Sequence, residues 1–261
     1  MEADCSELIC CPKCKKDLHY SGSENASPAL SGVWRCQQCA CEFPVNEGFI
    51  HFISQKEVFQ FSKRTEFFRK INARFYTPIT DFMFLPCGGA HHARRQVLEN
   101  LELQKGSTIL ETGIGTGDNI RFLGHKLDEC LLYGLDNQLR MLQTCARNAR
   151  KWKKTVKLYR ANAEELPFKD NSFDVVFHLG AFNLFQHKQE ALNEMIRVAK
   201  PGSRIVIADE TEKASKLFAI LIGKQEPVVP PIDLVPVNML QISLKIIWNG
   251  FGYLITFRKP G

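Results

Sequence analysis

The chain has 261 residues, of which 44% are hydrophobic and 24% charged, as in an ordinary soluble globular protein. This length can hold one α/β domain and a small accessory module. No apolar run approaches the roughly 20 residues of a membrane-spanning helix, and the acidic N-terminus lacks a signal-peptide hydrophobic region, so we expect a cytoplasmic protein without a membrane span. The formal net charge of +6 permits contact with RNA but does not require it.

Paired cysteines mark residues 1–53 as a separate unit. Two Cys-x-x-Cys motifs, separated by 21 residues, supply four thiols: Cys11, Cys14, Cys36 and Cys39. Four such thiolates can enclose one tetrahedral zinc, so the spacing predicts a closed structural site. About fifty residues bury little apolar surface, and a bound zinc would supply the missing folding energy. Free thiols or a redox pair are the alternatives, and the flanking Cys10 and Cys41 leave the ligand register open.

Residues 54–104 interleave aromatic and charged side chains. Helical periodicity over 67–75, and again over 90–101, predicts a helical linker between the cysteine-rich unit and the rest of the chain. The aromatic residues concerned are Phe59, Phe61, Phe67, Phe68, Phe75, Tyr76, Phe82 and Phe84.

A glycine-rich turn over 108–119 organises the remaining chain. A short apolar run ends at Glu111, and after Thr112 the glycines occupy alternate positions: Gly113, Gly115 and Gly117. Such a turn, at the carboxyl end of the first strand of an open α/β sheet, lets a nucleotide-like ligand approach the main chain. The dinucleotide fingerprint needs a glycine where this chain has Asp118, and the loop's two carboxylates repel phosphate. A cationic ligand without phosphate, such as S-adenosylmethionine, is favoured over a tight turn that binds nothing.

Residues 105–261 alternate between strand-like and helix-like segments, which predicts a parallel sheet. We expect strands over 131–136, 156–160, 171–178 and 200–209, with helices over 118–127, 138–152 and 189–198. Asp136 ends the second strand some twenty positions after the glycine turn, where a carboxylate suits hydrogen bonds to ribose hydroxyls and capping is the alternative. Asn249-Gly250 predicts an antiparallel hairpin over 243–258. The C-terminal end of the helix expected over 138–152 is rich in cations, which the helix dipole favours, and RNA contact is the alternative. These cations are Arg147, Arg150, Lys151, Lys153 and Lys154.

The glycine turn resembles motif I of the class I S-adenosylmethionine-dependent methyltransferases, and the later segments follow in that family's order. The run from Ala161 to Phe168 resembles the adenine loop, with Asn162 where an aspartate is usual, and Lys200-Pro-Gly resembles the turn before the fifth strand. The resemblance covers about 105–210 and is to methyltransferase type 11, the branch with the quinone-biosynthesis enzymes. It implies an α/β fold: a Rossmann-like, doubly wound, seven-stranded sheet with an antiparallel final hairpin, plus the small N-terminal zinc ribbon.

The resemblance also implies a cofactor site in the domain 105–261, partly covered by helices from 54–104. Its residues would be Glu111, Thr112, Gly113, Gly115, Gly117, Asp136, Asn137, Asn162, Ala163 and His178. The Asn162 amide can both donate to and accept from the adenine edge. His178 is a candidate general base if the acceptor must lose a proton, but packing against the cofactor is the alternative, and no catalytic residue is assigned.

Three functions remain open at this point. The first is methyl transfer from S-adenosylmethionine to a small organic or lipid-like acceptor. The second is methylation of rRNA or tRNA with the zinc ribbon as the RNA grip, since 11–52 resembles zinc-ribbon modules in front of some methyltransferases. The segment 11–52 also resembles a free-standing zinc-ribbon partner subunit of tRNA and protein methyltransferases. The third function is that of a non-catalytic cofactor-binding scaffold that docks a protein partner through the ribbon. The residues after His178 lack the Asn/Asp-Pro-Pro-Tyr/Phe pattern, which disfavours exocyclic adenine methylation.

Overall fold

The computed structural model describes residues 8–22, 32–53, 73–222 and 227–261. The strands are β1 (Leu18–Ser21), β2 (Gly32–Cys36), β3 (Glu42–Asn46), β4 (Phe49–His51), β5 (Thr108–Thr112), β6 (Leu131–Asp136), β7 (Lys157–Arg160), β8 (Phe173–Leu179), β9 (Ala199–Glu210), β10 (Leu240–Ile247) and β11 (Gly252–Arg258). The α-helices are α2 (Ala73–Met83), α3 (Ala90–Leu98), α4 (Asp118–Leu123), α5 (Leu139–Lys151), α6 (Lys188–Val198) and α7 (Glu212–Ile222).

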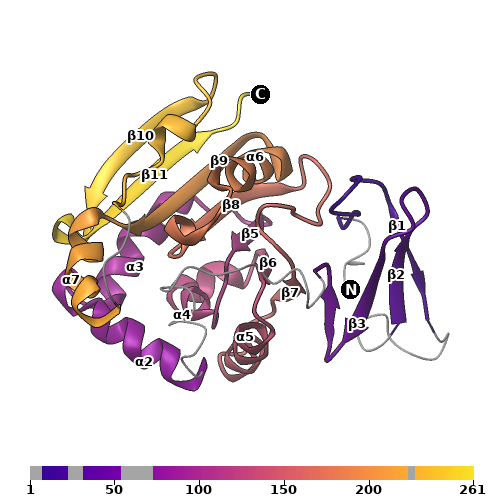
Figure 1. Cartoon of the computed structure of the whole chain (residues 1–261), viewed down its shortest axis with the longest axis horizontal. Helices are drawn as coiled ribbons and strands as arrows, with labels where there is room; N and C mark the ends of the chain where they lie inside the picture. The colour runs from indigo at the N-terminus through magenta and orange to yellow at the C-terminus, as the bar shows by residue number, and fades with distance from the viewer. Residues whose placement is uncertain (1–7, 23–31, 54–72, 223–226) are drawn as a thin grey trace.

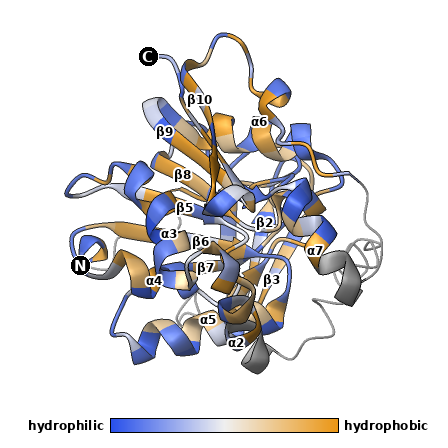
Figure 2. Ribbon diagram, turned by 90° about the vertical axis from the view of Figure 1, so that its left-hand side faces the viewer, coloured by the Kyte–Doolittle hydropathy of each residue, from blue (hydrophilic) through white to orange (hydrophobic). Residues whose placement is uncertain are grey.

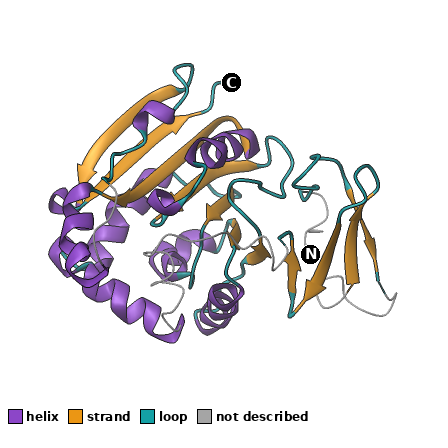
Figure 3. Ribbon diagram, viewed as in Figure 1, coloured by secondary structure: helices purple, strands orange, loops and turns teal. Residues whose placement is uncertain are grey.

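All the described strands belong to one sheet, in the order β1-β2-β3-β4-β7-β6-β5-β8-β9-β11-β10 (Figures 1 and 3). The run from β7 to β10 contains the seven strands expected of the methyltransferase unit, and β9, β11 and β10 pair antiparallel as expected. The whole sheet is nevertheless larger than these seven strands, because it has eleven. The four ribbon strands extend it, since β4 pairs in parallel with β7.

The strands separate two layers of helices. Alternate residues of β8 illustrate this: Val176 packs in a core with α6, whereas Val175 and Phe177 pack in a second core with α3, α4 and α5. This period of two follows from the pleat, which turns successive side chains to opposite faces. In Figure 2 the strands are coloured mainly as hydrophobic, and the helices beside them have both hydrophobic and hydrophilic residues. No helix in the described ranges is long and apolar enough to cross a membrane.

Several boundaries differ from the sequence expectation. The helix expected over 118–127 ends as an α-helix at Leu123, because Gly124 has φ 54° and ψ −127°, and a 3-10 turn follows. The strand expected to begin at Lys200 begins at Ala199, and the Pro-Gly turn forms a bulge inside it, with Gly202 at φ 77°. The expected aromatic residues Phe59, Phe61, Phe67 and Phe68 lie outside the described residues, as do the side chains of Phe75 and Tyr76.

The ribbon strands β1–β4 and the strands after them also share a hydrophobic core. Phe52 follows β4 and is only 4% exposed. Its ring lies 5.1 Å from Phe43 of the ribbon and 6.3 Å from Tyr159 of β7, measured between centroids. Tyr159 in turn packs edge-on against Phe168 at 5.2 Å. The ribbon at 1–53 and the domain at 105–261 are therefore separate segments of the sequence, but their buried side chains pack in one core.

We predict that Phe52→Ala lowers the free energy of unfolding by about 3–5 kcal/mol, the usual cost of emptying a buried phenylalanine site. Because the core is shared, urea unfolding followed by fluorescence and by circular dichroism should remain one coincident transition. Phe82→Ala is the matched control, since Phe82 is 70% exposed and its loss should cost less than about 0.5 kcal/mol. A separate early transition of the ribbon would contradict the shared core.

Candidate functional site

The predicted cofactor residues lie at one edge of the sheet. Strands β7, β6, β5 and β8 are adjacent and parallel, so their carboxyl ends meet there. The residues at or just after these ends are Glu111, Thr112, Gly113, Gly115, Gly117, Asp136, Asn137, Asn162, Ala163 and His178. Parallel pairing thus brings four separate segments of the chain to one place, as the sequence pattern predicts for an open α/β sheet.

The three glycines of the turn are required for different reasons. All have positive φ, at 69°, 56° and 78° for Gly113, Gly115 and Gly117. A Cβ on Gly113 would lie 2.9 Å from Cε1 of His178, and one on Gly117 would lie 2.6 Å from Sγ of Cys145. A Cβ on Gly115 would meet nothing within 4 Å. Packing therefore excludes a side chain at the first and third positions, while the open second position leaves room for a ligand beside the main chain.

The carboxyl group of Asp136 is hydrogen-bonded to this turn. Its Oδ2 accepts a hydrogen bond from the Gly115 N–H at 3.0 Å, and its Oδ1 accepts one from the Gln138 N–H at 2.8 Å. Burial raises the pKa of Asp136 to about 6, although the backbone N–H groups oppose the shift. The second strand tip and the glycine turn are therefore in direct contact, with a carboxyl group between them.

Glu111 is held by a series of buried hydrogen bonds, through Asn119 to Arg94, that the sequence did not reveal. The Asn119 amide donates to its Oε1 at 2.6 Å, and Arg94 of α3 donates to Asn119 Oδ1 at 2.6 Å. Arg94 also lies 3.7 Å from Asp118. Burial raises the pKa of Glu111 to about 8, and its Oε2 has no hydrogen-bond partner in the described part of the chain. A cation that reached Oε2 would satisfy that oxygen and favour the ionised carboxylate.

Arg94 corrects the electrostatic picture drawn from the loop alone. The turn itself contains no lysine or arginine, but α3 supplies a guanidinium that is only 6% exposed. The helical pattern carried a signal for it, because Arg94 shares the buried face of α3 with Ala93, Val97 and Leu98. Three carboxyl groups at 111, 118 and 136 still outnumber this one cation, so the site keeps a preference for positive charge.

His178 is enclosed beside the turn. It is fully buried, its Nδ1 lies 3.1 Å from Thr112 Oγ1, and its ring packs against Phe182 and Phe185 at 5.7 and 5.0 Å. Burial lowers its pKa to about 4, so the ring is neutral and weakly basic at neutral pH. These properties suit an aromatic wall of the site better than a general base.

The predicted adenine loop follows β7. Asn162 Oδ1 accepts a hydrogen bond from the Glu164 N–H at 3.2 Å, which fixes the start of the loop as an Asx turn. The N-terminal unit binds the other end, where Cys10 N–H donates to Pro167 O at 3.0 Å and Lys169 N–H donates to Leu8 O at 2.9 Å. Both ends of this loop are therefore fixed by hydrogen bonds.

The four predicted metal ligands form a second candidate site. The sulfurs of Cys11, Cys14, Cys36 and Cys39 all lie within 4.8 Å of one another. The pairs 11–39, 14–36 and 14–39 are separated by 3.5, 3.3 and 3.6 Å. A tetrahedral zinc with Zn–S bonds of about 2.3 Å requires sulfur separations of about 3.8 Å, so the cluster fits a zinc ion with little adjustment.

The two cysteine motifs have matched backbone turns. The Lys15 N–H donates to Cys11 O at 2.8 Å and the Ala40 N–H donates to Cys36 O at 3.0 Å. Lys15 and Ala40, each just after the second cysteine of its motif, have positive φ of 61° and 58°. This equivalence favours the register of 11, 14, 36 and 39 over one that uses Cys10 or Cys41.

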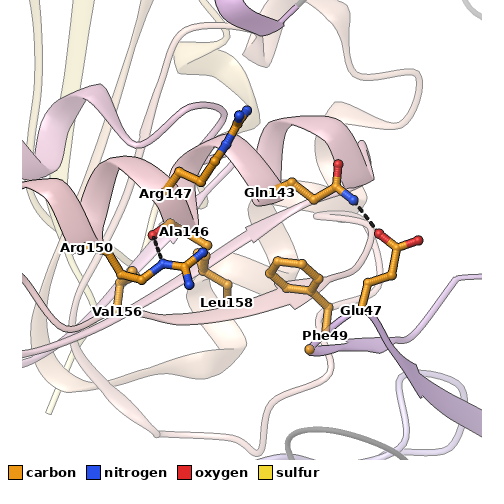
Figure 4. Close-up of a pocket in the computed structure, with 9 residues that line it drawn as sticks. Glu47, Phe49, Gln143, Ala146, Arg147, Arg150, Val156 and Leu158 are labelled. Carbon is orange, nitrogen blue, oxygen red and sulfur yellow. Dashed lines mark hydrogen bonds between the residues drawn. The ribbon is translucent and has the colours of Figure 1, made fainter.

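A groove of about 610 Å³ lies where the ribbon meets α5 (Figure 4). Gln143 donates to Glu47 of the β3–β4 turn across it. Its cations are bonded to their own helix: Arg147 donates to Thr144 Oγ1 at 3.0 Å and Arg150 to Ala146 O at 3.2 Å. Local bonding of these side chains agrees with a solvated helix end rather than a surface shaped for RNA.

Comparisons with known proteins assign the central region. Residues 110–207 match a family model described as a methyltransferase domain. The ubiquinone/menaquinone biosynthesis C-methyltransferase UbiE of Blochmanniella floridana is 36% identical over 138 residues, 51% of this chain and 54% of that protein. The demethylmenaquinone methyltransferase of Lactiplantibacillus plantarum is 36% identical over 135 residues, 50% of this chain and 56% of that protein. Residues 110–207 are therefore similar to a methyltransferase domain.

A solved structure agrees with this fold. The phosphoethanolamine N-methyltransferase 2 of Haemonchus contortus matches with a TM-score of 0.57 and 15% identity, over 84% of this chain and 62% of that one. The chain spans about half the length of the curated relatives it matches. The ribbon strands β1–β4, with their zinc-ribbon-like cluster of cysteines, lie outside the residues matched by the family model.

We predict that metal analysis of the purified protein finds about one zinc per chain, since four clustered thiols make one closed site. Cys36→Ser should remove most of the zinc and lower the midpoint of thermal unfolding, because metal binding contributes folding energy. Cys130→Ser is the control, as Cys130 is a partly buried thiol outside the cluster. A zinc-free protein of unchanged stability would refute the site.

Proposed function

We propose that this protein transfers a methyl group from S-adenosylmethionine to a small, quinone-like lipid acceptor. The observation that carries the cofactor assignment is the buried, unpartnered Oε2 of Glu111 beside the glycine turn closed by Asp136. The acceptor class rests on the relatives, whose names place them in ubiquinone and menaquinone synthesis. The RNA and protein-docking alternatives have no comparable support.

The residues at the sheet edge have distinct roles in this proposal. Glu111 would hold the ammonium of the cofactor through Oε2, and Asp136 would accept hydrogen bonds from the ribose hydroxyls. Asn162 and Ala163 would border the adenine, and the wall of His178, Phe182 and Phe185 would exclude water near the reacting end. The glycine at 115 would admit the cofactor to the main chain, since no side chain fills that space.

The chemistry requires little from acid–base groups. Bound S-adenosylmethionine supplies a methyl group on a positively charged sulfur, which leaves as a neutral thioether. Holding the acceptor carbon about 3 Å from the methyl, in line with the breaking bond, can supply most of the rate enhancement. The acceptor then loses its own proton to solvent. A histidine with a pKa of about 4 is a poor base at neutral pH, so we assign His178 a packing role.

We predict that S-adenosylmethionine binds about tenfold more tightly at pH 7 than at pH 5 through Asp136 alone. A carboxyl group with a pKa of about 6 is mostly protonated at pH 5 and must lose its proton before it can accept both ribose bonds, a cost of about tenfold. Calorimetry across this range measures the effect. Asp136→Asn should remove this part of the pH dependence, and Asp136→Ala should weaken binding well over tenfold at pH 7. Unchanged affinity in Asp136→Ala would refute the ribose role.

We predict that the protein incorporates labelled methyl into lipid rather than RNA. Purified protein is incubated with methyl-labelled S-adenosylmethionine and a cell extract separated into RNA, protein and organic-soluble fractions. A demethylmenaquinone reduced to its quinol is tested in parallel as a defined acceptor. Label should enter the organic fraction and the quinol, and Asp136→Ala should abolish most of it. Label found only in RNA or only in protein would contradict a quinone-like lipid acceptor.

A further inference from the structure

A histidine of the ribbon contacts the methyltransferase domain next to the predicted ribose loop. Strand β4 pairs with β7 in the register Ile50–Tyr159 and His51–Arg160, and the Phe52 N–H donates to Arg160 O at 2.8 Å. His51 is therefore the last residue of β4, level with the carboxyl end of β7. This is the edge of the sheet at which the cofactor residues lie.

Arg160 connects this histidine to the loop after β6. Its guanidinium is buried, with 7% of the residue exposed. Nε donates to the carbonyl oxygen of Asn137 at 3.1 Å, and Nη1 lies 3.1 Å from His51 Nδ1. One residue further on, the Ala161 N–H donates to Asp136 O at 3.2 Å. The main chain of the ribose loop, residues 136–137, is thus held from the end of β7 at two successive carbonyl groups.

The protonation of His51 follows from its partners. A guanidinium can only donate, so Nδ1 of His51 must accept from Arg160. The ring proton then lies on Nε2, which donates to the Asn46 carbonyl at 3.2 Å. Burial lowers the pKa of His51, which keeps the ring in this neutral form. The ribbon therefore presents one oriented acceptor to a buried cation.

We propose that His51 and Arg160 are a positioning pair through which the ribbon sets the ribose loop of the cofactor site. The role is one of positioning and not of chemistry: Arg160 fixes the carbonyl of Asn137 and, through the main chain, the carboxylate of Asp136. The inference rests on the proposed function in that Asp136 binds the cofactor ribose. Loss of the acceptor at 51 leaves a buried N–H of Arg160 unpaired, and a buried charge tolerates this poorly.

A second ribbon contact provides a matched control. Asp17 forms an ion pair with Lys169 at 2.8 Å, also between the ribbon and the methyltransferase domain, but these side chains are 72% and 41% exposed. Lys169 lies outside both the ribose loop and the predicted adenine loop, residues 161–168. Removal of this pair tests whether any contact across the boundary affects cofactor affinity, or only the contact that leads to Asn137.

The test measures S-adenosylmethionine binding by calorimetry in the zinc-loaded full-length protein. His51→Ala should weaken binding about tenfold, the loss expected for one hydrogen bond to a charged group. His51→Asn should stay within about twofold of wild type, because its Oδ1 can replace Nδ1 as the acceptor. Asp17→Ala should leave affinity unchanged. With the quinol as acceptor, His51→Ala should raise the KM for S-adenosylmethionine and leave kcat at saturating cofactor near the wild-type value.

A double-mutant cycle distinguishes positioning from general stability. If the two residues act as one unit, His51→Ala should add little to the weakening already caused by Arg160→Met. Zinc content and the unfolding midpoint are measured for each variant at the assay temperature. Equal affinity of wild type and His51→Ala would overturn the positioning pair while the proposed function stands. Additive losses in the cycle would overturn it too, as would a loss of affinity in both His51→Asn and Asp17→Ala equal to that in His51→Ala. A wild-type protein that does not bind S-adenosylmethionine would overturn both.

Discussion

The parallel pairing of β4 with β7 is the contact on which the arrangement of this protein depends. Two residue pairs, Ile50–Tyr159 and His51–Arg160, join a four-stranded antiparallel unit to a seven-stranded mixed sheet. Without β4, strand β7 would be an exposed edge with unpaired backbone groups, which invites non-specific pairing. The ribbon covers that edge and fills the space beneath it with Phe43 and Phe52. A module whose own core is too small to be stable thereby becomes part of a larger one.

Charge is distributed around the cofactor edge by burial as much as by residue type. Glu111 and Asp136 are both raised in pKa by desolvation, so each carboxylate is costly until a partner arrives. Arg94 offsets part of this cost through Asn119 without filling the position beside Glu111 Oε2. A ligand with positive charge and hydroxyl donors would satisfy what the protein leaves incomplete. Such a site selects against phosphate even though its glycine turn resembles that of nucleotide-binding proteins.

Local patterns in the sequence predicted what is local in the structure. The glycine turn, the strand tips at 136 and 178, the final hairpin and the clustering of four thiols all follow from short motifs with a fixed geometry. Arg94 and His51 did not emerge, because their importance depends on which elements become neighbours. The pattern of α3 placed Arg94 on a buried face, yet nothing in 90–98 indicates that this face meets Asn119. The pairing of β4 with β7 joins residues more than 100 positions apart, and no turn signal predicts it.

The strand count shows how such a long-range contact connects distant parts of the molecule. A separate ribbon would depend on a bound metal to fold, and its contribution to the rest of the chain would end at docking. Once β4 is a strand of the same sheet, the four-cysteine cluster, the shared aromatic core and the loop at residues 136–137 are connected by backbone hydrogen bonds and one buried guanidinium. Rigid, bonded connections of this kind transmit small displacements, since packed interiors deform little. We therefore expect that a change at the four-cysteine cluster, such as loss of a bound metal, shifts the position of Asp136, because both belong to one continuous sheet.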